Sequence, residues 1–215
     1  MPLIIHFFRV PRYKNIITGE YETIPFEDVR IINKYFDWKR ARAEQRVACY
    51  SLKAWCGVSE DDMPHKYIVN YYSDFYKPNP VYSDWDGELV EKYSIFEDLA
   101  RFVKSNQVLN WLINNVPGAK KDGNFHEISE DQVTRLCGTL KRTRKCLAYV
   151  GDELTVVDVE TARELLPVMD EVPLFWGPET YDSIYAEQVV NAYEIIRKIL
   201  NSTDFKKESI YFIAC

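Results

Sequence analysis

Histidine and glycine are scarce in this sequence, and their scarcity argues against several kinds of site. None of the three histidines lies three or four residues from another, and there is no Cys-x-x-Cys pair, so we expect no metal. The eight glycines are scattered singly, without a phosphate-binding loop, which argues against nucleotide transfer by a standard fold. No Gly-x-Ser-x-Gly context is present, and we assign no catalytic residue and expect no cofactor.

Long hydrophobic runs are also missing. No stretch reaches the roughly 18 apolar residues that a membrane span requires, and the apolar opening, residues 3–8, is too short for a signal sequence. The five cysteines are odd in number and lack the spacing of a disulfide framework, which indicates buried thiols. We therefore predict a protein of a reducing cytoplasm with no membrane partner.

Positive charge is in deficit. The chain has 27 Lys and Arg against 33 Asp and Glu, giving a net charge of −6, and such a balance disfavours nucleic acid as a partner. Two local basic groups keep a nucleic-acid binder open as an alternative: the stripe Lys39, Arg42, Arg46 and Lys53, and the cluster 141–145. Solvated helix faces explain such groups more often.

Aromatic residues, in contrast, are abundant, at 14% of the chain with 15 Tyr, 11 Phe and 5 Trp. Such a surplus is typical of a core rich in ring contacts or of a surface that meets partners. The length of 215 residues fits a single domain over 1–215. We divide it into a helical N-terminal part, 1–88, and an α+β core, 89–215.

The pattern of residues predicts an α+β fold: a small, mainly antiparallel sheet packed against several long helices. Branched and aromatic residues predict strands over 2–10, 89–96 and 208–214, with the N- and C-terminal strands paired. Two prolines predict a loop over 77–88. Helical periodicity and capping signals predict helices over 24–36, 37–57 (ending at Gly57), 65–76, 97–116, 159–166 and 181–200, and one more after the capping box Ser129–Gln132.

A cluster of rings surrounds one Gly-Pro turn in residues 174–188, "LFWGPETYDSIYAEQ". One hypothesis is that these rings only pin the start of the following helix to the core, with Gly177 supplying a backbone angle that a side chain would forbid. The other is that they bind a ligand. The nearby carboxylates Glu179 and Asp182 either favour the helix N-terminus or act in acid–base catalysis.

Four segments resemble, in order, a family of small uncharacterised proteins carried by phages and mobile elements, some of which bear the label phosphoglycerate kinase. The segments are "RFVKSNQVLNWLINNV" (101–116), "ARELLPV" (162–168), "FWGPETYDSIYAEQVVNAYEIIRKIL" (175–200) and "DFKKESIYFIAC" (204–215). The resemblance covers about residues 90–215. The motif positions of the family are held here by Lys104, Asn106, Trp111, Gly177, Tyr181, Asp182 and Tyr185.

The chain departs from the family pattern at two places. Leu109 stands where members often have histidine, and Pro178-Glu179 replaces a Ser-Thr pair. The missing phosphate loops and short length also do not support the kinase label. Because the aromatic frame survives while the motif histidine does not, binding is favoured over shared catalysis.

The resemblance implies a phage or prophage accessory protein of the bacterial cytoplasm. Our leading hypothesis is a non-enzymatic binder that sequesters a host protein or a small nucleotide-like ligand and counteracts host defence. The alternatives are a small hydrolase or transferase using Asp182 or Glu179, and a nucleic-acid binder or mimic; self-association stays open. The predicted binding residues are Phe175, Trp176, Tyr181, Asp182, Tyr185, Trp111, Asn106 and Lys104.

Overall fold

The structure is a computed structural model, and it describes residues 2–44, 51–68, 75–83, 88–170, 177–178 and 180–215. The fold is α+β, as the sequence predicts, with a main sheet of strand order β6-β1-β10-β7. The chain divides into two compact units. The first comprises Met1–Phe8, Leu99–Phe205 and Ile210–Cys215, and the second comprises Arg9–Asp98 and Lys206–Ser209. The single domain expected from the sequence stays a prediction.

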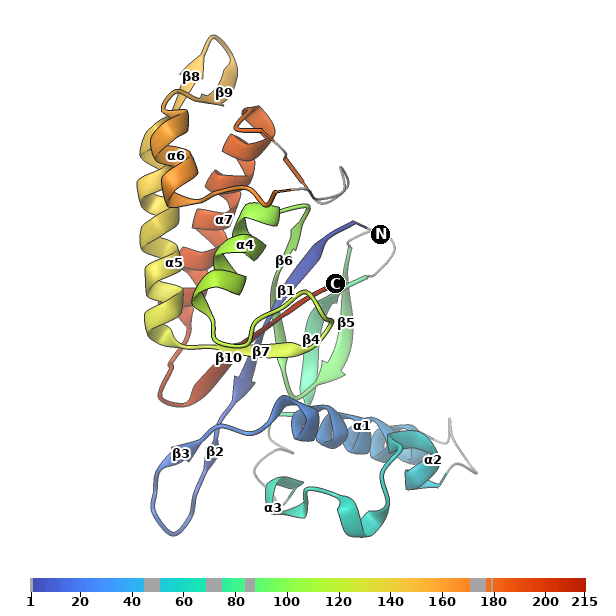
Figure 1. Cartoon of the computed structure of the whole chain (residues 1–215). Coiled ribbons are helices and arrows are strands. Elements are labelled where there is room, and N and C mark those ends of the chain that lie inside the picture. Colours follow the sequence, from blue (N-terminus) through green and yellow to red (C-terminus); the bar gives the residue numbers. More distant parts are fainter. Residues whose placement is uncertain (1, 45–50, 69–74, 84–87, 171–176, 179) are drawn as a thin grey trace. The chain divides into compact units, whose positions relative to one another are not determined.

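The first unit holds most of the main sheet and the helices that pack on it (Figure 1). Its elements, some of which end in the second unit, are β1 (Ile4–Pro11), β6 (Glu97–Val103), α4 (Asn106–Asn115), β7 (Phe125–Ile128), α5 (Glu130–Thr143), η2 (Arg144–Cys146), β8 (Leu147–Val150), β9 (Glu153–Val156), α6 (Val159–Leu165), α7 (Ser183–Ser202) and β10 (Glu208–Ala214).

The second unit contains one long helix, α1, together with shorter helices and strands. They are β2 (Tyr13–Lys14), β3 (Tyr21–Glu22), α1 (Phe26–Ala43), α2 (Leu52–Cys56), η1 (Glu60–Asp62), α3 (His65–Ile68), β4 (Lys77–Tyr82) and β5 (Leu89–Ser94). Strands β2 and β3 form one antiparallel hairpin, and β4 and β5 form another. No helix in the described part of the chain is both long enough and apolar enough to cross a membrane.

The two ends of the chain meet in the main sheet, which confirms the predicted pairing of the terminal strands. The backbone N–H of Ile4 donates to the carbonyl of Cys215 at 2.9 Å, and the N–H of Cys215 donates back at 3.0 Å. Strand β10 also pairs with β7 in antiparallel register, with Ile210 opposite Ile128. The sheet therefore depends on residues from both ends of the sequence.

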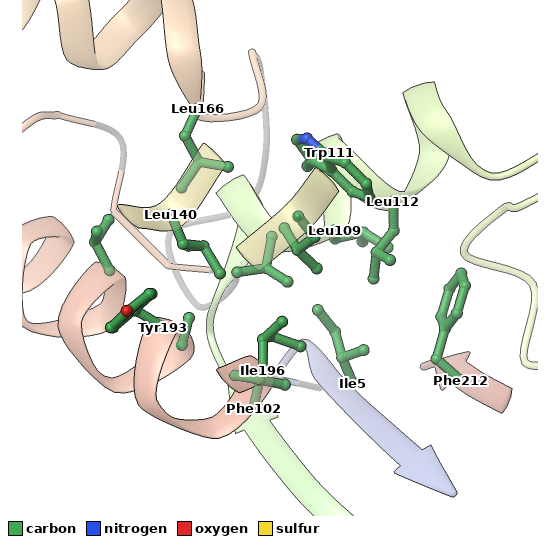
Figure 2. Packing of buried hydrophobic residues seen from close by; sticks show 14 of the residues in the cluster. Ile5, Phe102, Leu109, Trp111, Leu112, Leu140, Leu166, Tyr193, Ile196 and Phe212 are labelled. Atoms are coloured by element: carbon green, nitrogen blue, oxygen red, sulfur yellow. The ribbon is translucent and has the colours of Figure 1, made fainter. Parts of the chain in front are cut away.

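The core of the first unit lies between this sheet and helices α4, α5 and α7. Alternate residues of the N-terminal strand, Leu3, Ile5 and Phe7, are fully buried, as the two-residue period of a strand requires. Figure 2 shows Ile5 close to side chains from the helices, among them Leu109 and Ile196. Leu109, which replaces the histidine of the resembling family, is fully buried in this cluster.

The helix predicted over 97–116 is wrong in its first half. Residues 97–103 form strand β6, in which Ala100 and Phe102 face the core. Lys104 then adopts a positive φ of 57°, which no regular helix accommodates, and α4 starts at Asn106. Short apolar runs fit both the helical and the strand period, and pairing with β1 decides the outcome: the N–H of Lys104 donates to the carbonyl of Leu3 at 2.8 Å.

The predicted loop over 77–88 is also wrong, because its first six residues form strand β4. Pro78 and Pro80 are two residues apart, so both missing N–H groups lie on the same edge of the strand. In this two-stranded sheet that edge faces away from β5, and pairing continues through Asn79, which opposes Lys92. The predicted strand over 89–96 is present as β5.

The N-terminal helices differ from the prediction in their bounds. Residues 26–36 of the first predicted helix and 37–43 of the second form the single helix α1 rather than two helices. The predicted end at Gly57 is confirmed, since Gly57 caps α2 in the left-handed region with φ 77°. Only residues 65–68 of the helix predicted over 65–76 are described as helical, in α3.

The capping box at the start of α5 is confirmed. The Ser129 hydroxyl accepts from the N–H of Gln132 at 3.3 Å, and the Gln132 side chain accepts from the N–H of Ser129 at 2.8 Å. We predict that Ser129→Ala lowers the free energy of unfolding by about 1 kcal/mol. Urea denaturation with Thr134→Ala, on the exposed face of the same helix, as a control would measure this. Equal stability of the two variants would contradict the prediction.

Candidate functional site

The predicted aromatic corner lies where the chain enters α7. Phe175, Trp176 and Glu179 fall outside the described residues. Asp182 is the N-cap of α7, and its carboxylate accepts from the N–H of Tyr185 at 3.1 Å and from the Thr180 hydroxyl at 2.9 Å. One oxygen of Asp182 thus caps the helix, and the other accepts from a side chain just before it.

Asn106 at the start of α4 connects two loops to this helix. Its amide donates to the carbonyl of Pro178 at 2.8 Å, and its side-chain oxygen accepts from the N–H of Met169 at 3.2 Å. One turn further along α4, Asn110 donates to the carbonyl of Pro167 at 3.1 Å. Asn106 is fully buried, so its polar atoms stabilise the loops from within.

The two tyrosines of the corner brace the same loops. Their rings lie 4.9 Å apart between centroids. The hydroxyl of Tyr185, which is fully buried, donates to the carbonyl of Leu166 at 2.8 Å, and burial raises the pKa of this phenol. The Tyr181 hydroxyl accepts from the N–H of Val168 at 3.3 Å, and the Arg163 guanidinium lies 5.5 Å from the ring of Tyr181.

Gly177 lies against the backbone of Lys104. A Cβ at position 177 would be 1.8 Å from the Lys104 carbonyl oxygen, and Gly177 has a φ of 131°. The sequence-based prediction that this glycine supplies an angle forbidden to a side chain is confirmed. The Lys104 side chain itself is exposed.

The structure thus brings most of the described predicted residues together around the entry to α7, while Trp111 lies in the core with 7% of its surface exposed. Tyr185 and Asn106 present no surface to a ligand, and their bonds are those expected if the cluster pins the start of a helix. The binding role predicted for Lys104, Tyr181 and Asp182 stays a prediction.

A different part of the first unit carries an open hollow. It lies between the β8–β9 hairpin and the outer face of α7, and Figure 1 shows this hairpin extending beyond the ends of the helices. The volume of the hollow is about 910 Å³. We call it the hairpin hollow; its lining residues are Tyr149, Val150, Asp152, Glu153, Leu154, Ser183, Glu187, Val190, Asn191 and Glu194.

The hairpin that forms one wall is well anchored at its base. Leu147 and Leu154 pack on the core, and Val156 is buried in it. The two strands are joined by the two-residue turn Gly151–Asp152, in which Gly151 has a φ of 66°, as primed hairpin turns require. The backbone at the tip of the hairpin is therefore fixed by the turn and by packing of the strands on the core.

The hairpin hollow is acidic. Glu194 pairs with Arg144, at 3.2 Å, and with Arg197. In the part of the chain that the structure describes, the other carboxylates of the hollow, Asp152, Glu153 and Glu187, make no ion pair or hydrogen bond through their side chains. None of these three carboxylates is therefore paired with a cation among the residues that the structure describes.

Apolar side chains border these carboxylates. Tyr149 and Val150 at the hairpin tip are 72% and 63% exposed, and Leu154 and Val190 contribute to the lining. Exposed large apolar side chains next to a hollow are a mark of interaction sites. The combination suits an occupant that has both positive charge and apolar groups.

Sequence analysis did not identify the hairpin hollow. Its two walls are separated by about 30 residues along the chain, and α6 lies between them. One signal was present: "LAYVGDELTV" (147–156) alternates around a Gly-Asp pair, a pattern typical of a two-residue hairpin. The position of α7 beside that hairpin depends on tertiary packing.

The comparisons with known proteins add no relative. No family model matches the chain, and searches of curated proteins and of solved structures found no match. The resemblance to phage and mobile-element proteins therefore stays a prediction.

Proposed function

We propose that the protein is a non-enzymatic binder that captures a host protein through the hairpin hollow. The observation that carries the proposal is the juxtaposition of exposed Tyr149 and Val150 with three unpaired carboxylates around an open volume of about 910 Å³. The occupant is a basic segment of the partner with at least one large apolar side chain. Its cations would meet the carboxylates, and its apolar groups would pack on the hairpin tip.

Charge favours a protein partner over a nucleotide-like ligand. Phosphates would be repelled by Asp152, Glu153 and Glu187. Among the described residues no lysine or arginine lines the hollow, and the two arginines that pair with Glu194 are already engaged. An aromatic pocket for a base was predicted at Phe175, Trp176, Tyr181 and Tyr185. The first two lie outside the described residues, and Tyr185 is fully buried. We therefore propose that the sequestered partner is a protein and not a nucleotide-like ligand.

The same charges support a second candidate, a nucleic-acid mimic. Carboxylates grouped on one surface can occupy the basic groove of a DNA- or RNA-binding protein. Competition separates the two cases: a mimic is displaced from its partner by duplex DNA or RNA, and a binder of another basic segment is not.

The ordered motifs over residues 101–215 support a phage or prophage setting. In that setting, capture of a host protein, including one that acts in defence, is the accessory role we propose. Expression of the protein at graded levels in bacteria tests the sequestering role. A sequestering protein acts in proportion to its amount, because it does not turn over a substrate.

Charge-neutralising variants test the hollow itself. We expect Asp152→Asn/Glu153→Gln/Glu187→Gln to weaken binding of a labelled amphipathic peptide of leucine and arginine about tenfold, since each of three exposed ion pairs contributes about 0.5 kcal/mol. Fluorescence anisotropy between about 50 and 300 mM salt measures this, and the affinity of the native protein should fall with salt.

The matched control neutralises three exposed carboxylates elsewhere in the first unit, Glu160→Gln/Glu164→Gln/Asp170→Asn. It changes net charge by the same amount and should bind the peptide with at most a twofold loss. A Tyr149→Ala variant should weaken binding at all salt concentrations. Equal losses in the two triple variants would show that total charge, and not the hollow, attracts the peptide, and the proposal would fail.

A further inference from the structure

Strands β4 and β5 form a separate two-stranded ribbon (Figure 1). The outer edge of β4 carries Pro78 and Pro80, which lack the N–H groups that a further strand would need. Strand β5 contains no proline, and its outer edge is paired with no strand in the part of the chain that the structure describes. One edge of the ribbon is thus closed to a further strand, whereas the outer edge of β5, which we call the open edge, can accept one.

The register of the ribbon identifies the backbone groups of the open edge. The N–H of Ser83 donates to the carbonyl of Glu88 at 2.7 Å, so these two residues form a hydrogen-bonded pair. Because hydrogen-bonded and non-hydrogen-bonded pairs alternate along antiparallel strands, the N–H and C=O groups of Leu89, Glu91 and Tyr93 point away from β4. Two of these three residues oppose the prolines of β4, as the alternation requires. Among the described residues these outward groups make no hydrogen bond, and another extended strand would satisfy them.

Strand β5 is exposed to solvent but held in place at one end. All of residues 89–93 are exposed. The side chain of Asn79 donates to the carbonyl of Ser94 at 3.0 Å, and the N–H of Ile95 donates to the side-chain oxygen of Asn33 in α1 at 2.9 Å. Because the strand is ordered before any encounter, pairing along its open edge would lose little conformational entropy.

We propose that the open edge pairs with the open edge of a second copy of the chain. The two β5 strands run antiparallel about a two-fold axis at Val90, and the two ribbons become one four-stranded sheet. A two-stranded ribbon is marginal by itself, and additional strands stabilise it. The inference is independent of the hairpin hollow, which belongs to the first unit.

The charges of the strand select this register. Residues 88–94 contain three charged side chains, Glu88, Glu91 and Lys92. A two-fold axis at Glu91 or at Lys92 would place that residue opposite itself, and like charges directly opposite disfavour pairing. An axis at Val90 instead places Lys92 of each copy opposite Glu88 of the other. It also places Leu89 opposite Glu91, so that the outward backbone groups of the two strands meet.

Other charged groups beside the ribbon do not oppose this register. Arg40 of α1 stacks on the ring of Tyr93 at 4.0 Å and pairs with a glutamate one turn further along the helix. Asp37 of α1 accepts from a tyrosine hydroxyl, and Lys77 lies at the far end of the ladder from the axis. Residues 84–87 of the turn lie outside the described residues. Among the described residues, the charges of β5 and of Glu88 therefore set the register.

A proline on the open edge tests the pairing. Sedimentation equilibrium of the full chain between about 1 and 300 μM should show monomer and dimer in exchange. Glu91→Pro removes an outward N–H and leaves the ladder to β4 intact, because Glu91 stands opposite Pro80. It should raise the dissociation constant of the dimer about thirtyfold, since each copy loses a hydrogen bond across the axis.

Charge exchange tests the register. Lys92→Glu should weaken the dimer about tenfold, because two pairs change from attraction to repulsion. The double variant Glu88→Lys/Lys92→Glu restores opposite charges and should return the dissociation constant to within about threefold of that of the native chain. The control Lys77→Glu makes the same change of net charge on the closed side of the ribbon and should dimerise like the native chain.

A native chain that stays monomeric at about 300 μM would overturn the proposal, as would a Glu91→Pro variant that dimerises with native affinity. An equal loss in Lys77→Glu would show that total charge governs association, and failure of the charge exchange to restore affinity would exclude the axis at Val90. Circular dichroism checks the fold of the proline variant. The charge variants replace only exposed side chains, so they decide the question even where the proline variant does not fold.

Discussion

Gly177→Ala should lower the free energy of unfolding by about 4 kcal/mol, the combined cost of backbone strain and steric overlap. A methyl group at this position would lie 1.8 Å from the Lys104 carbonyl oxygen, and the φ of 131° is one that alanine rarely adopts. The Lys104 carbonyl cannot easily move aside, because it belongs to the backbone between β6 and α4. Differential scanning calorimetry should show a melting temperature about 10 °C below that of the native protein.

Gly138→Ala provides the opposite control. Gly138 lies within α5, has no positive φ, and its added Cβ would meet no atom within 4 Å. Alanine there should raise the free energy of unfolding by about 0.5 to 1 kcal/mol through helix propensity. If both alanine variants had the stability of the native protein, the close approach of residues 177 and 104 would not exist in solution.

Asn106→Ala should lower the free energy of unfolding by about 3 kcal/mol. The change removes two hydrogen bonds, to the carbonyl of Pro178 and from the N–H of Met169, and leaves both backbone groups without their partner in a buried place. It also releases the backbone of Met169 and Pro178 from α4, although Asn110 still donates to the carbonyl of Pro167. Urea denaturation measures the loss, and hydrogen exchange should show faster exchange at Met169.

Asn114→Ala on the same helix is the matched control for Asn106. Asn114 is exposed, and its amide donates only within α4, to Asn110, so its loss should change stability by less than about 0.5 kcal/mol. A native-like Asn106→Ala variant that nevertheless lost partner binding would instead restore the ligand-binding role predicted from the sequence. Loss of stability with binding retained would establish Asn106 as a structural residue.

Much of the fold could be read from local patterns. The branched and aromatic residues of 2–10 and 208–214 predict two strands, and their pairing is present. The capping box at Ser129 and the helix over 181–200 depend on neighbouring residues alone, and both are found. Gly177 belongs to the same class, because a glycine between a ring cluster and a helix start indicates an angle that other residues disfavour.

Burial and long-range proximity, in contrast, were decided by tertiary structure. Residues 97–103 satisfy both periods and become a strand only because β1 offers its edge. Tyr185 looks like a binding residue in the sequence, yet its hydroxyl is bonded to Leu166 inside the core. The hairpin hollow depends on Glu187 of α7 facing Asp152 and Glu153 of a distant hairpin. Local sequence fixes the backbone period and the caps, whereas packing of distant segments decides which side chains meet and which stay in contact with solvent.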